Sequence, residues 1–419
     1  MNDKSTLEML SMFSAGGKPV SDLSRFTALC NALGDPQNDL KFIHIAGTNG
    51  KGSVSEYLSR ALIDAGFKAG KFTSPYVFNI RERIQLQNRL ISKKDLDENL
   101  KLVISAAQKT GSGGSTAQEY SQFEILTAAA FLYFRKKSAD TVVLETGIGG
   151  LLDCTNIVTP EISIITAVGF DHSDILGAEL GDIASHKAGI IKHAPCVMYP
   201  VQERAAYVEI KTRAEKTGAE LIIPDLDSLA DEKISVYGND FTYKGGKFQT
   251  TMGGRHQILN ALTAIETLRA LGISGRYIKS GLKAALVPAR MQIIRKNPLI
   301  ILDGAHNRQS IAAAKEVFAL WRVRKAVVFG ILDGKDYLGA LQELSTFADM
   351  LVLTDGFAEN AISCSDLYRA ALLFGFYGGC IFTVSEPRRA VELATELCGG
   401  GIVLVTGSIR LAAAIDTGQ

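Results

Sequence analysis

The stretch that decides the fold is a glycine-rich segment that reads Gly47-Thr48-Asn49-Gly50-Lys51-Gly52-Ser53. An apolar run at 42–46 comes before it, and a helical apolar pattern at 54–62 follows it. A strand, a glycine loop and a helix in this order let backbone N–H groups and a helix N-terminus converge on phosphate. The stretch therefore predicts a phosphate-binding loop, and a plain glycine-rich turn is the alternative.

The residue types of this loop have separate uses. Glycine lets the backbone approach an anion, Lys51 supplies a positive charge, and the Ser53 hydroxyl is placed to ligate Mg²⁺. The spacing differs from the usual phosphate-loop motif, because Gly52 separates the lysine from the serine. The residues alone thus indicate chemistry on a nucleoside triphosphate with Mg²⁺, and they leave the acceptor of the phosphoryl group open.

Composition limits the class of protein. A chain of 419 residues exceeds what one hydrophobic core usually supports, so we expect two or more domains. The net charge of +1 gives no field that would attract nucleic acid or an anionic membrane. We see no signal peptide and no membrane-length apolar run, and the six cysteines form no C-x-x-C pair. We therefore expect a cytoplasmic protein with reduced thiols.

The apolar pattern predicts an α/β fold. Strands at 141–144 and 162–166 extend the first domain, and residues 195–252 show short strands with turn signals that suggest an antiparallel excursion. Strands and helices then alternate strictly, with apolar runs at 299–302, 326–329, 350–353, 381–384 and 402–405. This alternation predicts a second, smaller domain with a mainly parallel sheet, and we place the boundary near residue 295.

Polar side chains follow two of the predicted strands. Glu145 directly follows the strand at 141–144, at the edge where α/β sheets place ligand chemistry, and is a Mg²⁺ candidate. His172 follows the next strand and is either a ligand or a buried, hydrogen-bonded histidine. Lys187 lies on a predicted helix at 179–190, where the local pattern alone predicts a lysine that faces solvent.

Two further charged features have simple interpretations. The cluster Arg81-Glu82-Arg83 is typical of a solvated face. Glu124 lies near the start of an apolar helix at 123–134, where a carboxylate stabilises a helix N-terminus.

The ordered set of motifs resembles folylpolyglutamate synthase, often also dihydrofolate synthase, of the Mur ligase superfamily. It covers nearly the whole chain. The motifs that carry the resemblance are residues 47–53, Thr73-Ser74-Pro75, Glu82-Arg83-Ile84, Phe123-Glu124, Glu145 to Gly150, Leu152 to Asn156, Asp171-His172, Lys187 to Lys192, His256-Gln257 with Asn260, Asp303 to Asn307, Gly330 to Asp336 and Thr406-Gly407-Ser408.

The resemblance implies an ATP-dependent amide ligase. A reduced folate or dihydropteroate would take the γ-phosphoryl group on its carboxylate, and the amine of L-glutamate would then displace phosphate. It also implies a P-loop-type, Mur ligase central-type ATP-binding domain at 1–295 and a Rossmann-like glutamate ligase domain at 296–419. The implied partners are these small molecules and Mg²⁺, without nucleic acid or membrane, and we expect a monomer.

The resemblance also assigns site residues. Those matched to ATP binding are Gly50, Lys51, Gly52, Ser53, Asn260, Arg290 and Asp303. Those matched to Mg²⁺ are Ser53, Glu145 and His172. Those matched to the pterin-side pocket are Phe123, Leu152, Asp153 and Cys154. The catalytic pair would be Lys187, carbamylated to give an anionic oxygen ligand, and His306, near the phosphates.

The chain departs from the family pattern at four positions. They are Tyr76 for His, Leu151 for Arg, His186 for Glu and Ala289 for Gly. None removes an implied metal ligand, but Tyr76 and Leu151 leave open the choice between pteroate and folate. Two other functions stay open: a Mur-type ligase acting on a cell-wall precursor, and a regulator that binds ATP without ligating anything.

Overall fold

The computed structural model describes residues 4–14, 21–110 and 120–415. The chain divides into two compact units. Unit 1 comprises Met1–Val168, His172–Leu226 and Asn260–Leu282, and unit 2 comprises Gly169–Asp171, Asp227–Leu259 and Lys283–Gln419. Each unit contains a sheet with helices, so the predicted α/β class is confirmed. The boundary near residue 295 stays a prediction.

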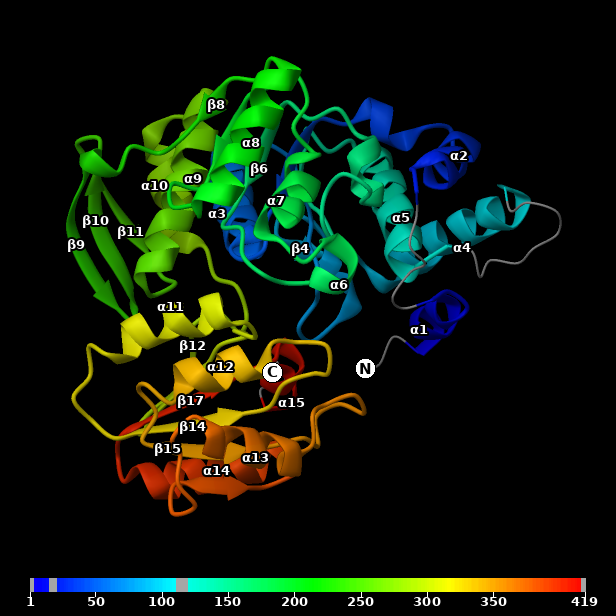
Figure 1. Cartoon of the computed structure of the whole chain (residues 1–419). Helices are drawn as coiled ribbons and strands as arrows, with labels where there is room; N and C mark the ends of the chain where they lie inside the picture. Colours follow the sequence, from blue (N-terminus) through cyan, green and yellow to red (C-terminus); the bar gives the residue numbers. More distant parts are fainter. Residues whose placement is uncertain (1–3, 15–20, 111–119, 416–419) are drawn as a thin grey trace. The chain divides into compact units, whose positions relative to one another are not determined.

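Unit 1 is built on an eight-stranded sheet (Figure 1). In spatial order its strands are β4 (Arg89–Leu90), β3 (Ile84–Leu86), β2 (Ala69–Phe72), β5 (Thr141–Glu145), β1 (Phe42–Ala46), β6 (Ile162–Ile165), β7 (Cys196–Met198) and β8 (Leu221–Ile222). All neighbours pair in parallel except at β3 and β4. Strands β1, β5 and β6 are buried along their whole length, as expected for the centre of a parallel sheet.

The helices of unit 1 pack on this sheet or on one another. They are α1 (Lys4–Ser11), α2 (Ser24–Ala32), α3 (Lys51–Asp64), α4 (Lys93–Thr110), α5 (Gln122–Lys136), α6 (Ser173–Leu176), α7 (Leu180–Ala188), α8 (Arg204–Thr217), most of α9 (Arg255–Ala270) and α10 (Gly275–Ala284). Two short 3₁₀ turns, η1 (Pro36–Asp39) and η2 (Ile80–Arg83), precede β1 and β3. Phe131 of α5 packs edge-on against Phe42 of β1, with ring centres 5.5 Å apart.

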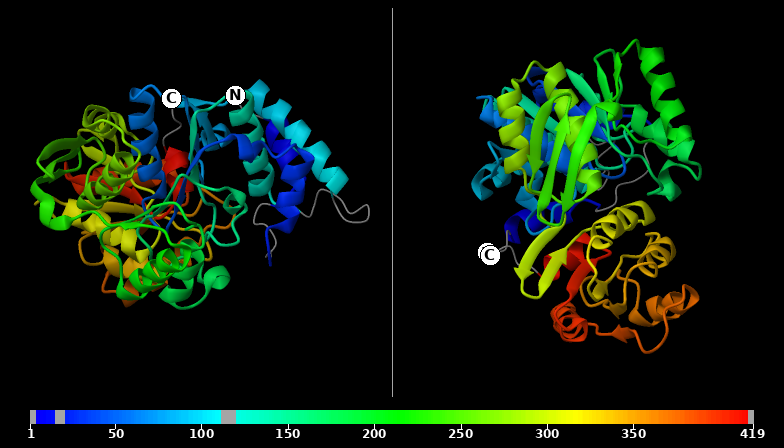
Figure 2. Two further views of the ribbon diagram at one scale, coloured as in Figure 1. Left: turned by 90° about the horizontal axis from the view of Figure 1, so that it is seen from above. Right: turned by 90° about the vertical axis from the view of Figure 1, so that its left-hand side faces the viewer.

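The expected antiparallel excursion is confirmed in part. Strands β9 (Leu229–Ser235), β10 (Gly238–Tyr243) and β11 (Gly246–Thr250) form a three-stranded antiparallel sheet in unit 2, visible as green arrows in Figures 1 and 2. The expectation of short strands is wrong at 204–217, which form helix α8. Its buried Ala206, Ile210 and Ala214 recur every four residues, which is a helical signal that the polar composition of the segment hid.

Unit 2 also contains a six-stranded sheet. In spatial order its strands are β12 (Gln292–Lys296), β13 (Leu299–Leu302), β17 (Ile402–Thr406), β14 (Lys325–Phe329), β15 (Met350–Leu353) and β16 (Ile381–Thr383), and only β12 is antiparallel. The five predicted apolar runs are confirmed as β13 to β17. Its helices are α11 (Arg308–Phe318), α12 (Tyr337–Leu344), α13 (Cys364–Leu373), α14 (Pro387–Cys398) and α15 (Ile409–Ile415).

Candidate active site

The glycine loop runs from the end of β1 into α3, as predicted. Gly47 has φ +148°, and a Cβ there would lie 1.9 Å from Thr166 Oγ1, so only glycine fits. Gly50 has φ +92°, and a Cβ there would lie 2.4 Å from Asn260 Oδ1. The side chain of Asn260, on α9, therefore packs directly against the loop at Gly50. Gly50 and Asn260 are both residues that the family resemblance matched to ATP binding.

The two glycines beside Lys51 should respond oppositely to alanine. Gly50→Ala should lower the free energy of unfolding by about 2 kcal/mol, because it places a Cβ in a left-handed conformation and against Asn260. Gly52→Ala should raise it by about 0.5 kcal/mol, because a Cβ there would meet nothing within 4 Å in the first turn of α3. Denaturant unfolding of both variants without nucleotide tests this contrast, and equal effects would contradict the loop geometry.

Three predicted site residues meet around the Gly47 carbonyl. Lys51 Nζ donates to Gly47 O at 3.1 Å and to Thr48 O at 3.3 Å. Lys187 Nζ, from α7, donates to the same Gly47 O at 3.0 Å. Lys51 Nζ also lies 3.9 Å from Glu145 Oε1 at the end of β5. The loop, the end of β5 and α7 thus bring two ammonium groups and a carboxylate to one point.

The burial of Lys187 corrects the local sequence interpretation. Only 4% of Lys187 is exposed, so the expectation of a solvent-facing lysine is wrong. Burying an ammonium group costs free energy unless hydrogen bonds or opposite charges compensate it. The Gly47 carbonyl that accepts from Lys187 is 140 residues away in the sequence, so the local pattern could not predict this contact. Such a position is typical of a functional lysine rather than a surface lysine.

The predicted oxygen and nitrogen ligands lie at the start of α3, at the end of β5 and just before α6. Ser53 is buried in the first turn of α3, and Glu145 is 3% exposed. His172 is partly buried and has φ +53° immediately before α6. In the described part of the chain, no three His, Cys, Asp or Glu side chains are grouped to hold a metal ion. The expected sets contain fewer than three such residues: Glu145 alone beside Ser53, and Glu145 with His172 beside Lys187.

Unit 2 positions two other predicted site residues, Asp303 and Arg290. Asp303, after β13, accepts the N–H groups of Met291 and Ala305, each at 2.9 Å. Arg290 Nη1 would lie 2.5 Å from a Cβ at Gly304, so the arginine packs on that glycine. The loop after β13 therefore holds Asp303 and Arg290 close together.

His306 lies in a polar group that the sequence did not predict. Its Nδ1 lies 2.9 Å from Gly304 O, and its Nε2 lies 3.5 Å from Asp171 Oδ2. Lys335 Nζ donates to Asp171 Oδ1 at 2.7 Å. Asp171 thus lies between the Lys335 ammonium group and the His306 ring, both in unit 2, and Lys335 is 164 residues away in the sequence.

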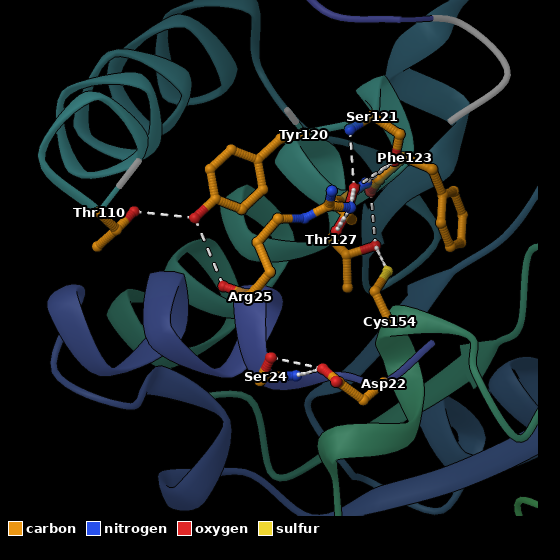
Figure 3. A network of polar contacts seen from close by, with 10 residues as sticks. Asp22, Ser24, Arg25, Thr110, Tyr120, Ser121, Phe123, Thr127 and Cys154 are labelled. Atoms are coloured by element: carbon orange, nitrogen blue, oxygen red, sulfur yellow. Dashed lines mark hydrogen bonds and ion pairs between the residues drawn. The ribbon is translucent and has the colours of Figure 1, made fainter. Parts of the chain in front are cut away.

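The start of α5 holds Phe123 in a polar network (Figure 3). Ser121 and Glu124 form a capping box, so the expected role of Glu124 at the helix N-terminus is confirmed. Arg25 Nη2 donates to both Glu124 oxygens, at 2.7 and 2.9 Å. No local sequence pattern predicts this pair, because Arg25 belongs to α2, 99 residues away.

Cys154 continues the network of Figure 3 on the pterin-matched side. Its Sγ lies 3.4 Å from Thr127 Oγ1, which donates to Phe123 O at 2.8 Å. Burial raises the pKa of the Cys154 thiol well above its ordinary value. Cys154 therefore stays protonated and links η5 (Cys154–Ile157) to α5.

The Asp153 carboxylate accepts hydrogen bonds from several residues of the glycine loop after β5 and of the turn that follows it. Its Oδ2 accepts the N–H groups of Gly147 and Ile148, at 2.9 and 3.1 Å. Its Oδ1 accepts both the N–H and the hydroxyl of Thr155, at 3.0 and 2.5 Å. Burial raises the pKa of Asp153, although these hydrogen bonds act to lower it. The carboxylate therefore fixes the loop beside Phe123, whose ring a Cβ at Gly147 would meet at 2.8 Å.

A histidine that the sequence analysis passed over supports this turn. His44, in the central strand β1, is fully buried, and its Nε2 lies 2.9 Å from Thr155 Oγ1. Its Nδ1 has no hydrogen-bond partner among the described residues. Burial, with a smaller effect from Lys192, lowers the pKa of His44 to about 3.

His44 should make the fold sensitive to acid. An unfolded histidine has a pKa of about 6.5, so below that pH the unfolded chain binds a proton that native His44 refuses. Stability should therefore fall as the pH drops from about 6.5 towards 3, by about 2 kcal/mol near pH 5. Denaturant unfolding near pH 7.5 and near pH 5 should show a smaller acid loss in His44→Gln. An equal loss in both proteins would show that another group causes it.

The charged cluster before β3 is not a solvated face. Glu82 accepts the N–H groups of Val77, Phe78 and Asn79, at 2.8, 2.9 and 2.7 Å. Arg83 lies over the rings of Tyr76 and Phe123. The prediction of a solvated face is wrong, because the pattern of charges could not show that the segment folds back on itself.

With this geometry in view, the comparisons with known proteins give the class of protein. A family model described as "Mur ligase middle domain" matches residues 45–268. A second family model, described as "Mur ligase, glutamate ligase domain", matches residues 289–409. The chain is also 33% identical over 415 residues to the dihydrofolate synthase/folylpolyglutamate synthase of Bacillus subtilis, covering 94% of this chain and 93% of that protein. The chain belongs to the Mur ligase family of ATP-dependent ligases. Within it, the chain belongs to the dihydrofolate synthase/folylpolyglutamate synthase group.

Solved structures agree with this assignment. A Mycobacterium tuberculosis folylpolyglutamate synthase complexed with ADP and AMPPCP superposes with a TM-score of 0.90 at 28% identity, covering 99% of this chain and 98% of that one. E. coli FolC in complex with DHPP and ADP gives a TM-score of 0.85 at 25% identity, covering 98% and 96%. In the described part of the chain, no helix is both long and apolar enough to cross a membrane.

Proposed function

We propose that this ligase joins L-glutamate to the carboxylate of a reduced folate, and also to dihydropteroate, at the expense of ATP. The observation that carries the proposal is the meeting of Lys51, Lys187 and Glu145 at the glycine loop, in a chain of this family. Neither alternative function is favoured by the comparisons, because the similar proteins reported above are named as folylpolyglutamate or dihydrofolate synthases.

The loop residues would bind and orient ATP. Lys51 would leave the Gly47 and Thr48 carbonyls for the phosphates, and the N–H groups at the start of α3 would point at them. The other residues in the proposed ATP site are Gly50, Gly52, Ser53, Asn260, Arg290 and Asp303. His306 would lie near the phosphates, where Asp171 holds its ring.

The donor set fits Mg²⁺. Glu145 offers a buried carboxylate, and Ser53 offers a buried hydroxyl at the start of α3, both of which are the oxygen ligands that Mg²⁺ prefers. His172 and Lys187, carbamylated on Nζ, would join Glu145 at a second position. When bound, Mg²⁺ neutralises the charge that develops on the transferred phosphoryl group.

The reaction would proceed in two balanced steps. A carboxylate oxygen of the acceptor attacks the γ-phosphorus of ATP, and the bond to ADP breaks, which gives an acyl phosphate. The amine of glutamate then attacks the acyl carbon, phosphate leaves, and an amide forms. Phe123, Leu152, Asp153 and Cys154 would shape the pterin-side pocket, in which Tyr76 and Leu151 are particular to this chain.

Other parts of the proposal concern the whole protein. We propose a monomer that works in the cytoplasm on small molecules, without nucleic acid or membrane partners, in line with its net charge of +1. We also propose the functional division at about residue 295, with the glutamate ligase domain after it. The family match to the glutamate ligase domain at 289–409 supports that division.

An isotope experiment tests the proposed function. An acceptor whose carboxylate carries heavy oxygen should transfer one labelled oxygen to inorganic phosphate for each amide formed, because the acyl phosphate step makes that oxygen part of the leaving group. Mass spectrometry of the phosphate measures the transfer. ATP hydrolysis without label in the phosphate and without glutamate in the product would contradict the proposal and favour a non-ligating ATP-binding protein.

A further inference from the structure

Arg83 ends the short turn η2 and lies among aromatic rings of unit 1. Its guanidinium carbon is 5.6 Å from the ring centre of Tyr76 and 5.8 Å from that of Phe123. The Phe123 ring in turn lies 5.6 Å from that of Phe72, a core residue of β2. Aromatic rings attract a planar cation and fix its orientation. The two rings therefore hold the guanidinium in position, and no protein carboxylate accepts a hydrogen bond from it among the described residues.

The N–H donors of the Arg83 guanidinium have few hydrogen-bond acceptors in the described part of the chain. Among the described residues, its one side-chain hydrogen bond is from Nη1 to Ser74 Oγ, at 3.3 Å. Its Nε is shielded from solvent and has no hydrogen-bond partner in the described part of the chain. Burial lowers the pKa of Arg83, but arginine remains charged in proteins. The charge of Glu145 attracts the guanidinium, but no hydrogen bond joins the two side chains among the described residues. A shielded N–H group without an acceptor is costly, which favours a further anionic acceptor at this position.

Ser74 connects Arg83 to the nucleotide side of the site. Its hydroxyl accepts from Arg83, and its N–H donates to Glu145 Oε2 at 3.3 Å. Glu145 itself lies beside Lys51 of the phosphate-binding loop. Arg83 therefore has the pterin-matched Phe123 on one side and the carboxylate that faces the phosphate loop on the other.

We propose that Arg83 binds the acceptor carboxylate of the substrate, the group that attacks ATP. The inference rests on the proposed function and names a residue of its acceptor site. The guanidinium fork can donate two parallel N–H bonds to one carboxylate, a geometry that lysine cannot reproduce. Such a pair offsets the repulsion between the acceptor carboxylate and the γ-phosphate and orients the attacking oxygen. Arg83 keeps its protons throughout, so it adds no step to the reaction.

The test compares an acceptor with its own neutral analogue. The probes are dihydropteroate and its carboxamide, or reduced folate and its γ-carboxamide, whichever acid the wild-type enzyme uses. Binding of acid and amide is measured by calorimetry in the presence of ADP, on full-length wild type, Arg83→Met, Arg83→Lys and Arg81→Met. Arg81 is the matched control, because it lies in the same turn and its Nε donates to Asn79 Oδ1 instead.

Wild type and Arg81→Met should prefer the acid by about 30-fold, and Arg83→Met should reduce that preference to about threefold or less. Arg83→Lys should lie between them, because it keeps the charge and loses the fork. If Arg83→Met weakens acid and amide equally, Arg83 only packs against the rings, and the inference is wrong.

Two controls keep the inference separate from the proposed function. Unchanged ADP binding shows that each variant is folded, and if Arg83→Met has lost it, Arg83→Gln takes its place under the same criterion. A wild type that makes no glutamylated product from any acceptor contradicts the proposed function. A productive wild type with an unchanged acid preference in the Arg83 variants contradicts the inference alone.

Discussion

Replacing Lys51 by alanine should lower ATP-dependent turnover by about 1,000-fold. In the structure the Lys51 ammonium group is held over the loop by the carbonyls of Gly47 and Thr48 and lies 3.9 Å from Glu145. The Lys51 ammonium group thus lies where the phosphates are proposed to bind. There its positive charge can stabilise the negative charge that develops during phosphoryl transfer. The rate of phosphate release at saturating ATP, glutamate and acceptor measures the loss.

Lys41→Ala is the matched control for Lys51→Ala. Lys41 lies just before β1, its side chain is 68% exposed, and it pairs with Glu161 at the surface. Solvent-exposed ion pairs contribute little to the free energy of unfolding, and Lys41 is not among the proposed site residues. This variant should therefore keep turnover within about twofold of wild type. If Lys51→Ala instead kept turnover within about tenfold of wild type, the loop would not be the phosphate site.

Lys187 should be as necessary as Lys51, for a different reason. If its carbamate supplies an oxygen ligand, Lys187→Ala and Lys187→Arg should both lose about 1,000-fold in turnover, because arginine keeps the positive charge and cannot be carbamylated. Removal of carbon dioxide should lower the activity of wild type, and bicarbonate should restore it. Isotope-labelled bicarbonate should add a carbamate signal that the variants lack.

Lys211→Ala provides the corresponding control. Lys211 lies on the neighbouring helix α8, and its side chain is 52% exposed, so its loss should leave turnover unchanged. A Lys187→Arg variant with near-normal turnover, and no carbamate signal in wild type, would show that Lys187 acts as a cation. The hydrogen bond from the Lys187 ammonium group to Gly47 O would then also be present during catalysis.

Strand positions were predictable from the sequence for a physical reason. Strands buried on both faces of a parallel sheet are apolar at nearly every position, so β13, β14, β15 and β17 stand out as short apolar runs between helices. The glycine loop between β1 and α3 was predictable because its glycines, lysine and serine lie within seven consecutive residues. Helix α8 was missed because only Ala206, Ile210 and Ala214 are buried along one side of an otherwise polar segment.

Contacts between distant segments could not be predicted from local pattern. The burial of Lys187 depends on α7 meeting the loop after β1, and the Arg25–Glu124 pair depends on α2 meeting α5. The same holds for Arg83, whose neighbours Tyr76 and Phe123 come from two separate segments. The resemblance to the ligase family supplied residues for the site, whereas the reasons for their positions come from the packing.

The measurement that tests the central claim most directly is phosphate release by the purified protein, run in parallel on dihydropteroate and on a reduced folate. The account predicts release that requires ATP, L-glutamate and an acceptor together, with both acceptors active despite Tyr76 and Leu151. Activity on the reduced folate alone would confine the protein to polyglutamylation. ATP binding without acceptor-dependent and glutamate-dependent release on either compound would contradict the account.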